Sequence, residues 1–389
     1  MLPRLTFLPV CSRQLSALFL LSFLSGAPFA AAQSPSPARA LELQQQGNLP
    51  AAEQEWRAWL ASNPKDPGAF ASLGVVLSRQ EKYAEAAAAY RKALALDSNL
   101  PGVPLNLGLA EFKLGNFKEA IVPLKTALAA DPQSLQATTL LGLSYYGAGD
   151  FTKAVPHLQK ALQADPENEE LHRVLAQDCL QAHEYECSLK EFRSILEKDP
   201  NSAAAHMLTG EALDGMSQTP EAITEFEAAV KADPNAADIH FGLGFLYWKM
   251  RQYDDAAKAF EAELAINPAH AQALAYLGDV ELKRENADKS LALLQQAVRL
   301  RQDIRLAYLD LGVIYTEKKL YPQALDALQA AEKLDPQQPD VHYRLGRVYQ
   351  AQGNSAEAEK EFARVKQLHE KSEEDVAKKM SGAMPAQKP

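Results

Sequence analysis

The stretch Ala222–Pro234, AITEFEAAVKADP, recurs with small changes along almost the whole chain. Its final proline returns at spacings of 34 or 68 residues, always after Asp or Asn, at Pro64, Pro132, Pro166, Pro200, Pro234, Pro268 and Pro336. A fixed period of this size indicates a repeat array. A chain of 389 residues could instead form two or three globular domains, but the periodicity favours one quasi-linear array.

Each period predicts a helical hairpin. In residues 237–270, the apolar residues of LGFLYWKM and AAKAFEAELAI both follow a 3.6-residue period, and the polar break RQYDD separates them. Pairs such as Gly115-Asn116 stand where a helix must stop and the chain reverse. The predicted units are 33–66, which is degenerate, then 67–100, 101–134, 135–168, 169–202, 203–236, 237–270, 271–304, 305–338 and 339–372, so that the regular array covers 67–372.

Small residues recur at two positions of the unit, counted from its first residue. Position 8 holds Gly74, Gly108, Gly142, Ala176, Gly210, Gly244, Gly278, Gly312 and Gly346. Position 20 holds Ala or Ser throughout, from Ala52 to Ala358. Because a glycine inside a helix costs about 1 kcal/mol relative to alanine, its recurrence implies close packing of the paired helices. Leucines at position 7 and large residues such as Tyr90 and Phe260 at position 24 are the predicted core.

This pattern resembles the tetratricopeptide repeat: Leu243-Gly244 with Tyr247 three residues later, then Ala256, Phe260 and Pro268. The resemblance covers residues 33–372 and implies an all-α, right-handed α-solenoid of about ten 34-residue helix-turn-helix repeats, with the first helices lining a concave groove. Departures are local: Ser98, Gln302 and Glu370 replace the terminal proline, Thr209 replaces the leucine, and the first unit lacks Leu-Gly. Residues 373–389 are predicted to contain the end of a capping helix and a disordered tail.

Residues 1–32 have the pattern of a signal peptide, with Arg4 and Arg13, an apolar stretch Leu15–Leu24 and a small-residue cleavage site at Ala30–Ala32. Cleavage would place the protein in the periplasm or outside the cell, and retention would anchor it at the membrane by its N-terminus. Loss of two arginines moves the formal charge from -10 to -12, and an acidic array is a poor ligand for nucleic acid. The signal and the Ala-rich repeats resemble those of exported proteins from Gram-negative-type bacteria.

Cys179 and Cys187 remain after such cleavage, and an exported protein meets an oxidising compartment. Cys179 is expected near the end of a first helix and Cys187 near the start of its partner. A disulfide across this hairpin requires Cα atoms within about 6–7 Å, a distance that the sequence does not fix. Two small thiols, in the core or at the surface, are the alternative.

No catalytic residue, cofactor or metal is predicted. His172, His206, His240 and His342 share position 4, but successive hairpins are separated by roughly 10 Å, too far for common metal ligands. These histidines are expected to occupy the aromatic position of the motif. The sequence contains no Gly-rich phosphate loop, His-Glu-x-x-His, Cys-x-x-Cys or Gly-x-Ser-x-Gly motif, which argues against an enzyme.

Function is therefore expected on the first helices, where positions 5, 9 and 12 form one stripe. Such a stripe is as often core as ligand site, but positions 7, 8 and 11 already supply a buried face. We therefore predict a second apolar face, typified by Phe241, Phe245 and Trp248, that awaits a partner. The predicted groove residues are Leu105, Leu109, Phe112, Leu143, Tyr146, Arg173, Gln177, Met207, Glu211, Phe241, Phe245, Trp248, Asp279, Tyr343 and Arg347.

Alternating polar and apolar stations suit an extended or helical peptide with apolar anchors. Some family members bind a C-terminal carboxylate with Lys at position 5, whereas this chain has Ala71, Leu105 or Phe241 there. The sequence thus favours a non-catalytic scaffold or adaptor that binds protein segments in the cell envelope. Such an adaptor could belong to a membrane-associated complex. The alternatives are a self-associating structural protein and an accessory subunit of polysaccharide or protein export or outer-membrane assembly.

Overall fold

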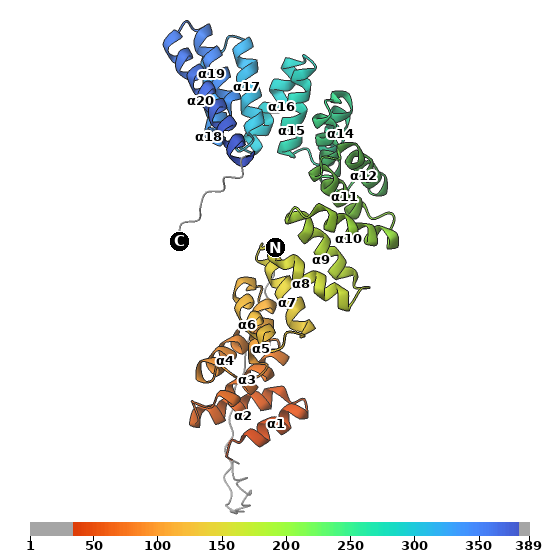
Figure 1. The fold of residues 1–389 in the computed structure, drawn as a ribbon, viewed down its shortest axis with the longest axis vertical. Helices are drawn as coiled ribbons and strands as arrows, with labels where there is room; N and C mark the ends of the chain where they lie inside the picture. The colour runs from red at the N-terminus through yellow and green to blue at the C-terminus, as the bar shows by residue number, and fades with distance from the viewer. Residues whose placement is uncertain (1–33, 381–389) are drawn as a thin grey trace, which may run out of the picture. The chain divides into compact units, whose positions relative to one another are not determined.

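A computed structural model describes residues 34–380 of the chain, with side chains up to residue 378. The predicted signal peptide and the predicted tail after residue 380 lie outside the described residues. Residues 34–380 form helices and no strand, in the order labelled in Figure 1. The helices are α1 (Pro37–Gln45), α2 (Leu49–Ser62), α3 (Pro67–Arg79), α4 (Tyr83–Leu96), α5 (Val103–Lys113), α6 (Phe117–Ala130), α7 (Leu135–Gly147), α8 (Phe151–Ala164), α9 (Glu169–Gln181), α10 (Tyr185–Lys198), α11 (Ala203–Gly215), α12 (Thr219–Ala232), α13 (Ile239–Lys249), α14 (Tyr253–Ile266), α15 (Ala271–Lys283), α16 (Ala287–Leu300), α17 (Arg305–Glu317), α18 (Tyr321–Leu334), α19 (Pro339–Ala351) and α20 (Ser355–Met380).

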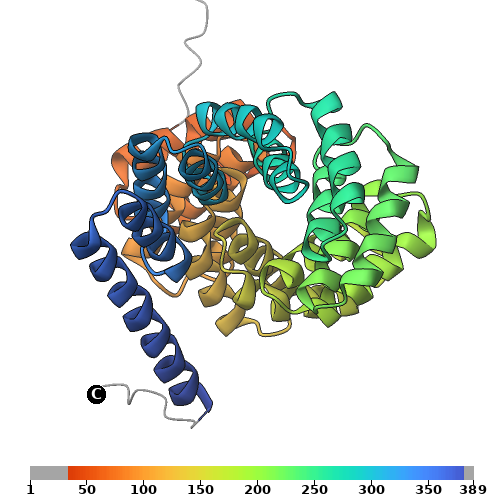
Figure 2. The ribbon, with the colours of Figure 1, turned by 90° about the horizontal axis from the view of Figure 1, so that it is seen from above.

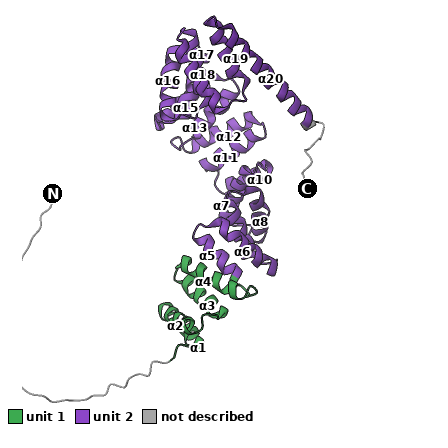
Figure 3. Cartoon of the chain, turned by 90° about the vertical axis from the view of Figure 1, so that its left-hand side faces the viewer, with its two compact units in different colours: residues 1–103 green, residues 104–389 purple. Residues whose placement is uncertain are grey.

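Each 34-residue unit holds one pair of helices, which confirms an all-α array of about ten helix-turn-helix repeats. α20 continues past the last repeat to Met380 as one helix. The chain divides into two compact units, residues 1–103 and 104–389, coloured in Figure 3. Within the second unit, each hairpin packs on the next in chain order (Figure 2). First helices such as α15 and α17 also touch.

The division between units coincides with a shortened helix. Most first helices begin at position 1, after a residue such as Ser134 or Asn168 whose side chain accepts a hydrogen bond from a backbone N–H of the first turn. Leu100 cannot accept such a bond, and α5 begins two residues later, after Gly102 with φ 73°. The repeat keeps its phase in sequence, but its first turn is lost.

α13 is shortened in the same way. Ala236 stands at the capping position, α13 begins at Ile239, and Asp238 takes a left-handed φ of 66°. The buried carboxylate of Glu263 on α14 replaces the missing cap, because it accepts hydrogen bonds from the backbone N–H groups of Asp238 (3.4 Å) and Phe241 (3.2 Å). A negative charge at this end of a helix is favourable.

The turn between paired helices has one geometry in every repeat. Position 15 is left-handed in all ten, with Gly47, Gly115, Gly149 and Gly353 at φ 75–77°. The other six repeats place Glu81, His183, Ser217, Arg251, Glu285 and Lys319 there, at φ 59–63°. The following N–H then bonds to the carbonyl of position 11, as in Asn116 to Glu111 at 2.9 Å, which satisfies a terminal carbonyl of the first helix.

The core of each hairpin lies where position 8 faces position 24. A Cβ added to Gly74 would lie 2.5 Å from the ring of Tyr90, and one added to Gly244 would lie 2.7 Å from the ring of Phe260. The same overlap recurs at the other position-8 glycines. Position 20 is buried beside this contact, and where it is serine the hydroxyl donates to the opposite backbone: Ser290 bonds to the carbonyl of Gly278 at 2.7 Å. The close packing expected from the small residues is therefore present.

Among residues 34–380, no helix combines the length and apolar character that a membrane span needs.

Replacement of Gly244 by leucine is expected to destabilise the second unit by about 1–3 kcal/mol, because the new side chain overlaps the buried ring of Phe260. Urea unfolding followed by circular dichroism measures the effect. Gly68→Ala is the control: its Cβ would meet only Asp66 Oδ1 at 3.5 Å, so the array should keep or slightly gain stability. Equal midpoints for wild type and Gly244→Leu would contradict this account of the core.

Candidate functional site

The predicted groove residues lie on the first helices, but their exposure differs. Asp279 is buried, Arg173, Glu211, Tyr343 and Arg347 are exposed, and the remaining ten are half-buried. Leu105, Leu109 and Phe112 of α5 pack against the hydrophobic cluster that α7 and its neighbours form. Neighbouring repeats therefore cover much of the predicted stripe.

The aromatic trio of α13 corrects one expectation. Tyr276 of α15 lies among Phe241, Phe245 and Trp248, with ring centroids 5.9, 5.5 and 5.0 Å from theirs. His270 also approaches Phe241, at 4.8 Å between ring centroids. The prediction that this apolar face is surplus and awaits a partner is wrong for most of its area, because the next repeat packs on it.

Hydrogen bonds also join positions 12 and 9 of successive first helices. The Tyr146 hydroxyl lies 3.1 Å from Gln177 Oε1, and Trp248 Nε1 donates to Asp279 Oδ2 at 2.7 Å. Asp279 is only 2 % exposed. Its predicted role in contacting a partner directly is therefore corrected: its carboxylate is taken up by contacts between repeats.

An open cavity remains between α17 and α19. Its volume is about 270 Å³. Tyr343, which is 48 % exposed, and Arg347, two of the predicted groove residues, line it. Sequence reasoning missed the other lining residues, Val313, Thr316, Glu317, Arg344 and Ala351. Val313 and Thr316 stand at groove positions 9 and 12, so the predicted register contained the signal for these two, whereas the other three lie outside it.

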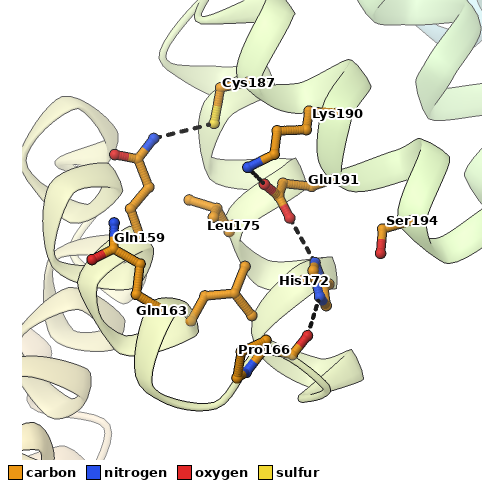
Figure 4. Close-up of a pocket in the computed structure, with 10 residues that line it drawn as sticks. Gln159, Gln163, Pro166, His172, Leu175, Cys187, Lys190, Glu191 and Ser194 are labelled. Carbon is orange, nitrogen blue, oxygen red and sulfur yellow. Dashed lines mark hydrogen bonds and ion pairs between the residues drawn. The ribbon is translucent and has the colours of Figure 1, made fainter.

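A second cavity, of about 350 Å³, lies among α8, α9 and α10 (Figure 4). His172 borders it, with Nδ1 2.6 Å from Glu191 Oε2 and Nε2 2.9 Å from the carbonyl oxygen of Pro166. Lys190 Nζ lies 3.4 Å from the other oxygen of Glu191. His172 thus connects its own hairpin to the loop of the preceding repeat.

The same arrangement recurs in two other repeats. His206 contacts Glu225 and the carbonyl of Pro200, and His342 contacts Glu361 and the carbonyl of Pro336. His240 keeps only the proline contact, at 2.9 Å, because position 23 of its repeat is Ala259. The position-4 histidines, expected merely to occupy an aromatic position, make polar contacts between repeats.

Cys179 and Cys187 form a disulfide between α9 and α10, with Cα atoms 5.8 Å apart. They stand at positions 11 and 19. In residues 271–304 the same positions hold Glu281 and Lys289, which form an ion pair at 3.0 Å. The disulfide therefore replaces a polar contact across the hairpin rather than adding a new kind of site.

Two groups of side chains bring metal-binding atom types together among the described residues. In one, Glu184 lies near the two cysteines, whose sulfurs are bonded to each other. In the other, Asp238 and Glu263 meet His270, whose Nδ1 accepts the backbone N–H of Ala273 at 3.0 Å. A neutral ring then carries its proton on Nε2, the atom that faces Asp238 at 3.0 Å, so that no lone pair is offered to a metal.

Asp178 is a buried carboxyl group at position 10, where other repeats have residues such as Val76, Ala212 and Val280. Neither of its carboxyl oxygens has a hydrogen-bond partner among the described residues. Burial, with a smaller contribution from the charge of Glu184, raises the pKa of Asp178 to about 7. This residue destabilises the fold when it ionises.

Models of the tetratricopeptide repeat match residues 38–101, 105–169, 145–212, 243–304 and 340–372, and a TPR repeat model matches 216–250 and 314–353. The chain belongs to the tetratricopeptide repeat (TPR) family. A comparison with curated proteins finds no match. TPR arrays are typically non-catalytic, and membership of this family supports a role as a protein–protein interaction scaffold.

Several solved structures resemble this TPR chain. YrrB, "a TPR protein with an unusual peptide-binding site", is 23% identical, with a TM-score of 0.39, over 46% of this chain and 91% of its own. Yeast Tom70 is 16% identical, with a TM-score of 0.39, over 85% and 91%. Naa15/Naa10 bound to HypK-THB gives 17% identity and a TM-score of 0.46, over 85% and 62%. At these values the likeness concerns the fold alone.

Replacement of Asp178 by alanine is expected to stabilise the second unit by about 1–3 kcal/mol at about pH 8, because the variant lacks an unpaired buried carboxylate. In the wild type, the unfolded chain releases this proton from about pH 4 upward while the fold retains it to about pH 7, so stability falls across that window. The gain should therefore shrink toward pH 4. Urea midpoints across this pH range test it, with exposed Asp326→Ala as control; a pH-independent difference would contradict the assignment.

Proposed function

We propose that this TPR array binds a segment of a partner protein along the first helices of its second unit, α5 to α19. The observation that carries the proposal is the cavity between α17 and α19, where the exposed Tyr343 and Arg347 remain uncovered by other repeats. Elsewhere on this face, the apolar groove residues pack largely against their neighbours. The cavity is therefore a part of the predicted groove that has room for an anchor.

The lining indicates what kind of segment would fit. Val313 and the ring of Tyr343 offer apolar contact, and Arg344 and Arg347 supply two guanidinium groups. Within residues 34–378, neither arginine forms an ion pair, although Arg347 Nη1 lies 3.5 Å from the Tyr343 hydroxyl. Guanidinium groups pair well with carboxylates. A segment with an apolar anchor beside an acidic residue would match both features, and Glu317 at the rim would disfavour a second acid.

We further propose that the protein is exported, through the signal-like residues 1–32, and acts as an adaptor in the cell envelope, free or attached to a membrane-associated complex. The apolar stretch and basic residues of that segment support export. Self-association through the same face is the competing proposal. Sedimentation at several concentrations separates the two, since a monomer at all concentrations argues against self-association.

Photocrosslinking tests the location of the groove. A benzoyl-phenylalanine placed at residue 343 should crosslink a protein partner in cells, identified by mass spectrometry, whereas one at residue 122 should not. Val122 is the matched control because it is 69 % exposed on α6, a second helix of the same unit. Crosslinks only between copies of this chain would favour self-association, and equal yields from both positions would contradict the groove.

The double variant Tyr343→Ala, Arg347→Ala should weaken binding of the purified partner, once crosslinking has identified it, at least about tenfold. Truncation of an anchor residue in an interface typically costs more than about 1–2 kcal/mol of binding free energy. Isothermal titration measures the change, and circular dichroism should show unaltered helicity because both side chains are exposed. Val122→Ala should bind as wild type. Unchanged affinity of the double variant would place the site elsewhere.

A further inference from the structure

Asp279 and Asp310 bring two buried carboxyl groups together across neighbouring repeats. Asp279 on α15 is 2 % exposed and Asp310 on α17 is 4 % exposed. α15 and α17 are in contact, and the side chains of Asp279 and Asp310 lie within hydrogen-bonding reach of each other. Oδ2 of Asp310 is buried and lacks a hydrogen-bond partner within residues 34–378. The pair therefore lies inside a repeat junction rather than at the solvent-exposed surface.

Two carboxylates in contact at a buried site cannot both be ionised without strong repulsion, so one of them keeps a proton. Asp310 is the residue that keeps it. Its burial, and then the charge of Asp279, raise the pKa of Asp310 well above its ordinary value, while Lys283 and Arg344 oppose this rise. A protonated Asp310 can donate its hydroxyl to the carboxylate of Asp279.

Two further groups contact the carboxyl oxygens of Asp279. Trp248 Nε1 on α13 donates to Asp279 Oδ2 at 2.7 Å, and Lys283 Nζ lies 3.6 Å from Asp279 Oδ1. The charge of Arg344 on α19 favours the ionised form of Asp310 and so opposes the rise of its pKa. The charged and hydrogen-bonding groups around the pair thus come from α13, α15, α17 and α19, the first helices of four successive repeats.

We propose that Asp279 and Asp310 form a proton-operated latch between the repeats 271–304 and 305–338. The proton on Asp310 makes the hydrogen bond that joins α15 to α17. Its loss leaves two facing carboxylates in a buried junction, and the junction then opens more often. The latch acts on the array itself and does not depend on what the groove binds.

The direction of the pH effect follows from where the proton is lost. An unfolded or locally opened chain releases the proton of Asp310 near its ordinary pKa of about 3.9, whereas the closed junction retains it to a higher pH. The closed state is therefore most favoured below about pH 4 and is progressively weakened as pH rises through this window, by up to tenfold in the opening equilibrium for each pH unit.

Hydrogen exchange of the full chain, read by mass spectrometry on peptides from α15 and α17 and corrected for intrinsic exchange, tests the latch. Between about pH 5 and about pH 9, wild-type protection in these helices should fall by on the order of tenfold or more. Asp310→Asn should remove most of this dependence, because asparagine supplies a permanent donor to Asp279 that cannot ionise.

Two further variants complete the test. Asp279→Asn removes the charge that faces Asp310 and should also reduce the pH dependence, so the proposal stays testable if Asp310→Asn folds poorly. Asp326→Asn replaces an exposed aspartate on the adjacent α18 and should behave as wild type. A wild-type pH profile in both Asp279→Asn and Asp310→Asn, with α3 and α4 equally protected in all proteins, would overturn the latch.

Discussion

The contact between position 8 and position 24 is the constraint on which the rest of the array depends. At Gly244, a single added carbon would lie 2.7 Å from the ring of Phe260. The ring of Phe260 on the second helix therefore packs directly against the backbone of the first helix. Repetition of this distance keeps the hairpins alike, and alike hairpins can stack without a change of register. Where this position holds alanine, as at Ala176, the residue still packs with a buried ring, that of Phe192.

Because the same contact recurs in every repeat, the period of the sequence was sufficient to predict the fold, the helix pairs and the buried positions. Local backbone geometry was less predictable. Position 15 is left-handed whether it holds Gly115 or Lys319. In a sequence, only the glycines indicate this backbone conformation. The unit boundary near Val103 also coincides with a local feature, the late start of α5 after the left-handed Gly102, which a pattern based on apolar residues does not register.

The groove was predicted in its register but not in its exposure. The sequence of one first helix shows which side chains share a stripe. Their solvent exposure, however, depends on which side chains of the next first helix pack on them. Tyr276 stands at position 6, and its ring contacts Phe245 and Trp248 of the preceding repeat. The repeat motif does not require a large residue at position 6. Tyr343 stays exposed in the last repeat, where no further first helix follows along the described chain.

Much of the interior of the hairpin is constant, and the repeats also differ in the contacts across and between hairpins. Positions 11 and 19 show this directly, with an ion pair in Glu281–Lys289 and a disulfide in Cys179–Cys187. A repeat in such an array contacts only its neighbours, so each junction has few ways to compensate for a lost contact. An ionisable pair placed in a junction, as Asp279 and Asp310 are, then affects the stability of that junction more than the same pair would within a single multiply connected core.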